Sequence, residues 1–210
     1  MITNATDTCP QHAPALPPFP LVQLMLDIET AGKYPGCPVL QIGAVTVVAP
    51  RTCYTFGLYF YGNASLCSNI ADGLTPEEDT MEWWKTQDPT IYEAVFSSGV
   101  LIRNLLQDFA TFCAKHGPNL QVWCCGTDFD ISILSHAYRK LGIAIPWKYN
   151  AIRDYRTIRE QFPPPANLLS EVAPNTTKHD ALADAIYQTN VLLATNAYVE
   201  RVSNGALRVL

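Results

Sequence analysis

The pattern of apolar and polar positions predicts three successive strands in the first third of the chain. Apolar and β-branched runs cover residues 22–28, 39–48 and 53–61, and turn-forming residues fill the connection at 31–38. β-branched and aromatic side chains favour strands, and short connections join antiparallel neighbours. We therefore expect an antiparallel meander at this end of the chain.

The remainder of the chain is predicted to be mostly helical. Apolar residues recur at helical spacing within residues 100–115, and the sequence Thr-Pro-Glu-Glu at 75–78 marks a helix start. A short buried strand is expected at 120–124. Further helices are expected at residues 128–141, 153–162 and 179–201. This order predicts an α/β fold in which helices flank a mixed sheet whose first three strands are antiparallel.

The composition is that of one globular domain with an N-terminal extension. Of the 210 residues, 48% are hydrophobic and 16% are charged, which suffices for one sizeable core. Residues 1–20 hold five prolines and predict an extended arm, which leaves 21–210 as a single domain. The sequence lacks a bilayer-length apolar run and a signal-peptide pattern, so we expect a cytoplasmic protein without a membrane partner.

Two acidic residues interrupt the apolar first strand. Asp27 and Glu29 are two positions apart, so on a strand both side chains project from the same face. Adjacent carboxylates raise each other's pKa and destabilise the fold unless a cation lies between them, and divalent cations prefer such oxygen ligands. The pair alone also allows a simpler interpretation, a strand end whose acids are solvated.

Two later segments contain further acids and a histidine. Asp130 falls in the first turn of the helix predicted after the 120–124 strand, and His179 precedes Asp184 by five residues near the start of the last helix. Carboxylates from two strands and two helices could hold two divalent cations about 4 Å apart, an arrangement that clamps a scissile phosphate. A histidine beside them would deprotonate the attacking water. Taken alone, a histidine at this point is more typical of a helix cap.

Taken in order, these motifs resemble the DEDD exonuclease superfamily, in the subclass that carries a histidine in its third motif. They read Leu-Asp-Ile-Glu-Thr at 26–30, Trp-x-x-Gly-x-x-Phe-Asp at 123–130 and His-x-x-x-x-Asp at 179–184. The Trp-Trp pair at 83–84 and the Arg-Asp-Tyr-Arg-Thr segment at 153–157 resemble a narrower branch, which includes exodeoxyribonuclease VIII, phage exonucleases and ribonuclease-T-like exoribonucleases. The resemblance implies a ribonuclease-H-like α/β fold with a mixed five-stranded sheet. It also implies metal-dependent 3′-to-5′ hydrolysis that releases nucleoside monophosphates.

The resemblance also implies roles for individual residues. His179 would act as the general base, and two Mg²⁺ or Mn²⁺ ions would be held by Asp27, Glu29, Asp130 and Asp184. Asp128 competes with Asp130 for the third ligand position, and helix residues two apart point about 200° away from each other, so only one can face the cleft. The resemblance places the ligand directly after Phe129, which selects Asp130 and leaves Asp128 as the expected helix cap.

The candidate contacts to nucleic acid rest on aromatic and basic residues. Adjacent helix residues point about 100° apart, so at most one tryptophan of the 83–84 pair is expected to stack on a base, and a core role is the simpler interpretation. Six of the fourteen Lys and Arg residues fall within 139–159, which predicts a basic patch despite the net charge of −5. A solvated helix surface is the simpler alternative. The predicted contacts are Trp83, Trp84, Lys85, Arg153 and Arg156.

The expected substrate is the 3′ end of DNA or RNA, with single-stranded DNA favoured. An exoribonuclease is the alternative, because the distinction depends on contacts to the 2′-hydroxyl that the sequence does not reveal. A third interpretation is a catalytically silent module that binds nucleic acid or a polymerase, and the presence of every expected ligand argues against it. The sequence leaves a homodimer and a phage origin open.

Overall fold

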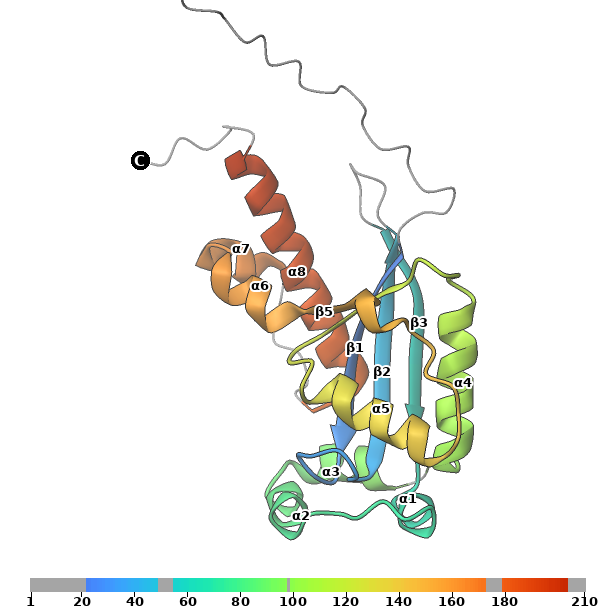
Figure 1. Cartoon of the computed structure of the whole chain (residues 1–210). Helices are drawn as coiled ribbons and strands as arrows, with labels where there is room; N and C mark the ends of the chain where they lie inside the picture. The colour runs from blue at the N-terminus through green and yellow to red at the C-terminus, as the bar shows by residue number, and fades with distance from the viewer. Residues whose placement is uncertain (1–21, 49–54, 98, 173–178, 204–210) are drawn as a thin grey trace, which may run out of the picture.

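Five strands form one mixed sheet in the computed structural model, which describes residues 22–48, 55–97, 99–172 and 179–203 (Figure 1). The strands are β1 (Val22–Thr30), β2 (Val39–Val48), β3 (Thr55–Asn63), β4 (Gln121–Cys124) and β5 (Ile152–Asp154). Their order across the sheet is β3-β2-β1-β4-β5. The β1–β2 and β2–β3 pairs are antiparallel, whereas β4 and β5 continue parallel to β1. The predicted mixed sheet with an antiparallel first half is confirmed.

Helices cover both faces of the sheet and one of its ends. They are α1 (Leu66–Ala71), α2 (Glu78–Lys85), α3 (Pro89–Phe96), α4 (Ile102–Ala114), α5 (Asp130–Lys140), α6 (Tyr155–Gln161), α7 (Ala166–Val172) and α8 (Ala181–Ser203), with one 3₁₀ turn at Tyr149–Ala151. Helices α4 and α5 match the helices predicted at 100–115 and 128–141. The last helix begins at Ala181, two residues later than predicted.

Four elements differ from the sequence prediction. Strand β5 occupies the start of the segment that was predicted to be helical from residue 153, and α6 only then begins. Helices α1, α3 and α7 were not predicted, because six to eight residues give too few turns for a periodic apolar stripe. Local signals nevertheless mark two of them. The Ser65 hydroxyl accepts the Ser68 N–H at 3.0 Å, and the Asp88 carboxylate accepts the Thr90 N–H at 2.8 Å.

The alternation of side chains along β1 divides the core into two layers. The even-numbered side chains, Leu26 among them, pack in the largest apolar cluster with α4 and α5. Met25 points to the opposite face, where it packs in a second cluster with residues of α8 such as Leu192. Asp27 and Glu29 share this odd-numbered face, so the fold directs both carboxylates toward α8.

Two further predictions concern the N-terminal arm and membrane-spanning helices. The arm predicted at residues 1–20 lies outside the described residues. Across the described ranges, no helix combines the length and apolar character needed to cross a bilayer.

Candidate active site

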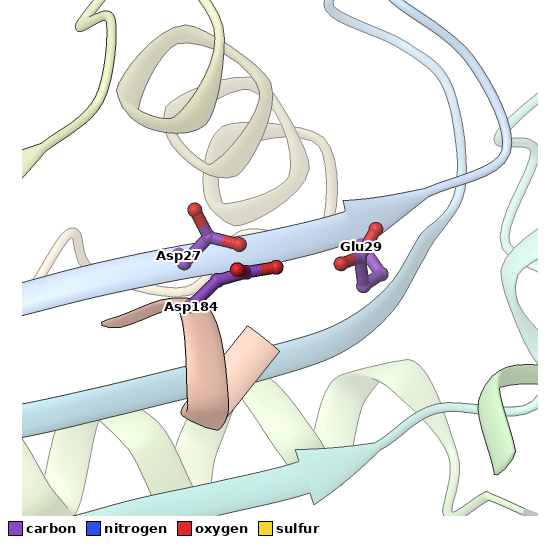
Figure 2. A group of neighbouring side chains, drawn as sticks. All are labelled: Asp27, Glu29 and Asp184. Carbon is purple, nitrogen blue, oxygen red and sulfur yellow. The ribbon is translucent and has the colours of Figure 1, made fainter. Parts of the chain in front are cut away.

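Three carboxylates meet between β1 and α8. Asp27 and Glu29 project from the second half of β1, and Asp184 projects from the first turn of α8 (Figure 2). One carboxylate oxygen from each residue lies within 4.8 Å of the other two. The motifs at 26–30 and 179–184, about 150 positions apart, therefore form one acidic cluster.

Strand β2 allows α8 to approach this closely. Gly43 pairs with Asp27 across the β1–β2 ladder, and a Cβ atom at position 43 would overlap the backbone of Ala181 and Leu182. The neighbouring Gln41 is fully buried, and its Oε1 accepts the Ala181 N–H at 3.2 Å. A glycine and a glutamine thus hold the start of α8 over the strand. Neither residue was among the predicted site residues, although a glycine within a strand often marks close approach of another backbone.

Asp130 lies on the floor of the same cavity, at the first position of α5. It is 3% exposed and lines the cavity together with the three clustered carboxylates. Asp128 is exposed, and Phe129 occupies the N-cap position without a side-chain capping bond. The predicted capping role of Asp128 is therefore wrong, because the N-cap of the helix lies one residue later than the sequence suggested. The choice of Asp130 over Asp128 as the inward carboxylate agrees with this geometry.

Burial and mutual repulsion disfavour ionisation of these acids. Burial raises the pKa of Asp27 to about 7, with further upward contributions from the charges of Asp184 and Asp180. The pKa of Glu29 is raised well above its usual value, first by burial and then by the Asp27 charge. Burial and the Asp27 charge likewise raise the pKa of Asp130. The cluster is electrostatically strained, which a divalent cation would relieve.

His179 occupies a left-handed turn immediately before α8. Its φ of 63° is the only positive φ at a non-glycine position among the described residues. The backbone N–H of His179 donates to Asp184 Oδ2 at 2.9 Å, which closes the turn. Such a conformation is sparsely populated, and persists where surrounding contacts hold it. His179 therefore lies beside the carboxylates because of this turn. The helix that was predicted to begin at His179 begins at Ala181 instead.

Two tryptophans of α2 form one wall of the cavity. The Trp83 ring meets the His179 ring edge to face, with centroids 5.0 Å apart, and its side chain is 41% exposed. Trp84 is 1% exposed, and its Nε1 donates to the Thr30 carbonyl oxygen at 2.8 Å. Trp84 thus has the core role that the sequence allowed, whereas Trp83 presents an accessible ring.

The predicted basic contacts lie outside the residues that line the cavity. Lys85 pairs with Glu82, Arg153 donates to the Asn150 carbonyl at 2.9 Å, and Arg156 donates to the Cys125 carbonyl at 2.9 Å. Their role in binding nucleic acid stays a prediction. Within the described part of the chain, the one Lys or Arg that lines the cavity is Lys33, in the loop after β1. Sequence reasoning missed it because its place depends on how that loop folds.

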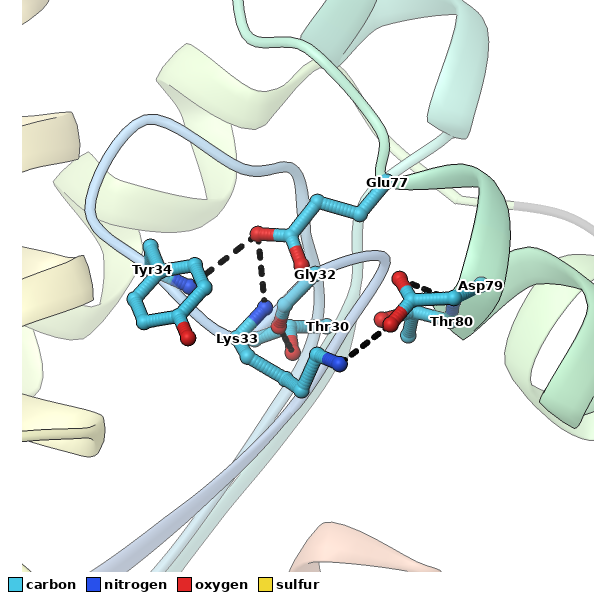
Figure 3. Close-up of polar contacts among 7 residues, drawn as sticks. All are labelled: Thr30, Gly32, Lys33, Tyr34, Glu77, Asp79 and Thr80. Atoms are coloured by element: carbon cyan, nitrogen blue, oxygen red, sulfur yellow. Dashed lines mark hydrogen bonds and ion pairs between the residues drawn. The ribbon is translucent and has the colours of Figure 1, made fainter.

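Polar contacts join the loop after β1 to α2 (Figure 3). Glu77 Oε1 accepts the backbone N–H groups of Lys33 at 3.0 Å and Tyr34 at 3.3 Å, and the Lys33 ammonium pairs with Asp79. These contacts hold the aromatic wall beside the carboxylates. The resulting cavity of about 690 Å³ falls within the size range of small-molecule sites and can accept a nucleotide.

Known structures share the fold at low sequence identity. Cell-death related nuclease 4 (CRN-4) superposes with a TM-score of 0.55 at 15% identity, over 86% of this chain and 65% of that chain. A full-length 3′-exonuclease gives 0.50 at 8% identity, over 93% of this chain and 64% of that chain. The ribonuclease domain of the yeast Pop2 protein gives 0.51 at 8% identity, over 85% and 76%. This chain therefore spans slightly less than two thirds of the first two proteins.

The predicted ribonuclease-H-like fold is confirmed by these likenesses. No curated protein sequence matches the chain. A family model does match, over residues 22–195, which include all of the motifs described above. The chain belongs to the Rv2179c-like 3′-5′ exoribonuclease domain family, whose description agrees with the exonuclease family that the three motifs resemble.

Proposed function

We propose that this chain removes nucleotides from the 3′ end of single-stranded nucleic acid, with metal ligands Asp27, Glu29, Asp130 and Asp184 and with His179 as general base. One observation carries the proposal: three carboxylate oxygens from β1 and α8 lie within 4.8 Å of one another in a cavity that His179 and Trp83 also line. This arrangement places a base, an accessible aromatic ring and a set of cation ligands around one space.

The donor set fits hard divalent cations such as Mg²⁺ or Mn²⁺. Carboxylate oxygens are the ligands that these ions prefer. The pKa values of Asp27 and Glu29 are raised first by burial and then by neighbouring carboxylates, and a bound cation would favour the ionised forms of both. When bound, two such ions would neutralise charge on the scissile phosphate and lower the pKa of the attacking water.

The protein groups around this space divide the remaining tasks. The His179 imidazole accepts the proton of the attacking water, and the bond from its backbone N–H to Asp184 holds it beside the carboxylates. Glu29 orients that water. Trp83, exposed on the cavity wall, offers its ring to the terminal base.

The family description favours RNA as the substrate. Single-stranded DNA, which was favoured from the sequence, is the second candidate. Both have a 3′-terminal nucleotide that suits the cavity, and they differ in the 2′-hydroxyl. The silent-module interpretation is not favoured, because all four acids and the histidine line the cavity.

The test uses 5′-labelled single-stranded RNA and DNA of the same sequence, incubated with the full chain and Mn²⁺. A ladder that shortens from the 3′ end is expected, with RNA degraded faster. Full activity in excess EDTA, or internal cuts in place of a ladder, would contradict the proposal. Faster degradation of DNA would reverse only the choice of sugar.

His179→Ala is expected to lower kcat by roughly 10²- to 10⁴-fold, which is the usual contribution of a general base. Metal affinity should change little, because the Asp184 carboxylate remains. Single-turnover rates and Mg²⁺-dependent melting temperatures measure the two effects separately. His136→Ala is the matched control, since His136 lies on α5 outside the residues that line the cavity. Near wild-type turnover of His179→Ala would remove the histidine from the mechanism.

The metal-free protein is expected to lose stability as the pH rises from about 4 to about 7. In this window the folded chain binds more protons than the unfolded chain, because the pKa of Asp27 is raised from 3.8 to about 7 and that of Glu29 is also raised. For each such proton, the free energy of unfolding falls by up to about 1.4 kcal/mol per pH unit. Denaturant unfolding in EDTA measures this slope. Asp27→Asn should flatten the slope, and a wild-type slope of zero would contradict the expectation.

Mg²⁺ should reverse this loss, because it binds only the folded, ionised cluster. The rise in melting temperature on adding Mg²⁺ is therefore expected to be larger at pH 8 than at pH 5. An equal rise at both pH values would show that Mg²⁺ binds elsewhere.

A further inference from the structure

Gln188 approaches the carboxylate cluster from the same face of α8 as Asp184. The two residues are four positions apart, so they lie one above the other on the helix. Gln188 is 8% exposed and lines the cavity, and its Nε2 donates to Asp27 Oδ1 at 2.7 Å. Helix α8 therefore gives the β1 pair two groups, a carboxylate and an amide.

The orientation of this amide is determined by Asp27. The other end of the amide, Oε1, is buried and has no hydrogen-bond partner within the described residues. Rotating the amide by 180° would place Oε1 against a carboxylate oxygen, and two acceptors repel each other. A buried acceptor without a partner destabilises a fold, so packing alone would favour an apolar residue here. The chain nevertheless has an amide at this position. Its side-chain hydrogen bond within the described residues goes to Asp27, a candidate metal ligand.

We propose that Gln188 is a positioning residue that fixes the rotation of the Asp27 carboxylate relative to Glu29 and Asp184. The inference rests on the proposed function, because it assigns Gln188 to the same cation site. A carboxylate that accepts a bond at 2.7 Å from a buried helix side chain cannot turn freely about its own axis. The site is then pre-organised, and a cation does not have to restrict that rotation on binding.

A purely structural role makes a different prediction. If the bond served only to tie α8 to β1, its loss would lower the stability of the metal-free protein and leave the affinity for the cation unchanged. If the bond orients Asp27, its loss weakens metal affinity while the metal-free protein stays as stable, since the substitution also removes the buried acceptor without a partner.

Gln188→Met separates the two roles, because methionine keeps the length and helix preference of glutamine and lacks the donor and the acceptor. The full chain, freed of metal by EDTA and dialysis, is titrated with Mg²⁺ while its melting temperature is recorded. Half-saturation is expected at a concentration roughly 10- to 100-fold higher than in the wild type, the usual effect of losing a group that orients a metal ligand. The metal-free melting temperature should not fall. At saturating Mg²⁺, the KM for a short oligonucleotide should match that of the wild type.

Asn190→Met is the matched control. Asn190 is half-buried on the same helix. It follows Gln188 by two residues, so its side chain points away from the face that carries Gln188. Its Mg²⁺ titration should match that of the wild type. As a second measurement on the wild-type protein, the side-chain amide resonances of Gln188 should shift during the same titration.

The outcomes distinguish this inference from the proposed function. A wild-type chain that does not bind Mg²⁺ would overturn the proposed function and, with it, the inference. If the wild type binds Mg²⁺ and the Gln188→Met variant reaches half-saturation at the same Mg²⁺ concentration, the inference alone is overturned. If the variant does not fold, unshifted Gln188 amide resonances in Mg²⁺-bound wild type would overturn it.

Discussion

Gly43→Ala is expected to abolish metal binding and to lower kcat by at least about 10²-fold, the scale of loss that follows a 1 Å displacement in an active site. The added methyl group would overlap the backbone of Ala181 and Leu182, which cannot rotate away as a side chain can. Helix α8 must shift outward, and Asp184 and His179 shift with it. Mg²⁺-dependent melting and single-turnover hydrolysis measure the loss.

Gly57→Ala is the matched control for this substitution. Gly57 also lies within a strand, and its added methyl group would lie 2.5 Å from the Thr46 hydroxyl oxygen. Neither Gly57 nor Thr46 lines the cavity. This overpacking should cost about 1 to 3 kcal/mol of stability while metal affinity remains. Wild-type Mg²⁺ affinity in Gly43→Ala would show that the approach of α8 to β2 is not required.

Asp184→Asn is expected to reduce hydrolysis by at least about 10³-fold, equivalent to about 4 kcal/mol in activation free energy. The substitution removes one of the three clustered carboxylates, and an amide is a weaker ligand for a hard cation. The asparagine oxygen can still accept the His179 N–H, so the turn before α8 should persist. The metal-free melting temperature should therefore stay near that of the wild type.

Asp184→Ala provides the comparison, because it loses both the charge and the acceptor. Removing a bond to a charged acceptor should cost about 1.5 to 3 kcal/mol of folding stability in addition to the loss of activity. Differential scanning calorimetry of the two variants in EDTA separates the ligand role of Asp184 from its role in holding His179. Activity of Asp184→Asn within tenfold of the wild type would exclude it as a ligand.

The sequence sufficed for those features that depend on local pattern. Two-residue alternation placed Asp27 and Glu29 on one face of a central strand, and the β-branched runs located β2 and β3. The order of the motifs identified the enzyme class before any contact between them was known. These inferences succeeded because strand periodicity and motif spacing can each be recognised from a few consecutive residues.

Features that depend on packing between distant segments were not predictable in the same way. The acceptor for Gln188 lies 161 positions away, and the Lys33 ammonium reaches Asp79 only because the loop after β1 folds against α2. Asp128 was misassigned because the sequence cannot tell where α5 begins to within one or two residues. Two signals were nevertheless present: a glycine inside a strand at position 43, and a polar side chain four positions after Asp184.

The contact between α8 and β1 also determines when the acidic cluster can form during synthesis of the chain. Asp27 and Glu29 leave the ribosome early, and the segment that carries Asp184 and Gln188 follows more than 150 residues later. A nascent chain that ends before residue 181 holds two of the three clustered carboxylates and has no helix to bring the third. Such a chain cannot assemble the acidic cluster, which forms only after α8 has been synthesised and packs against β1.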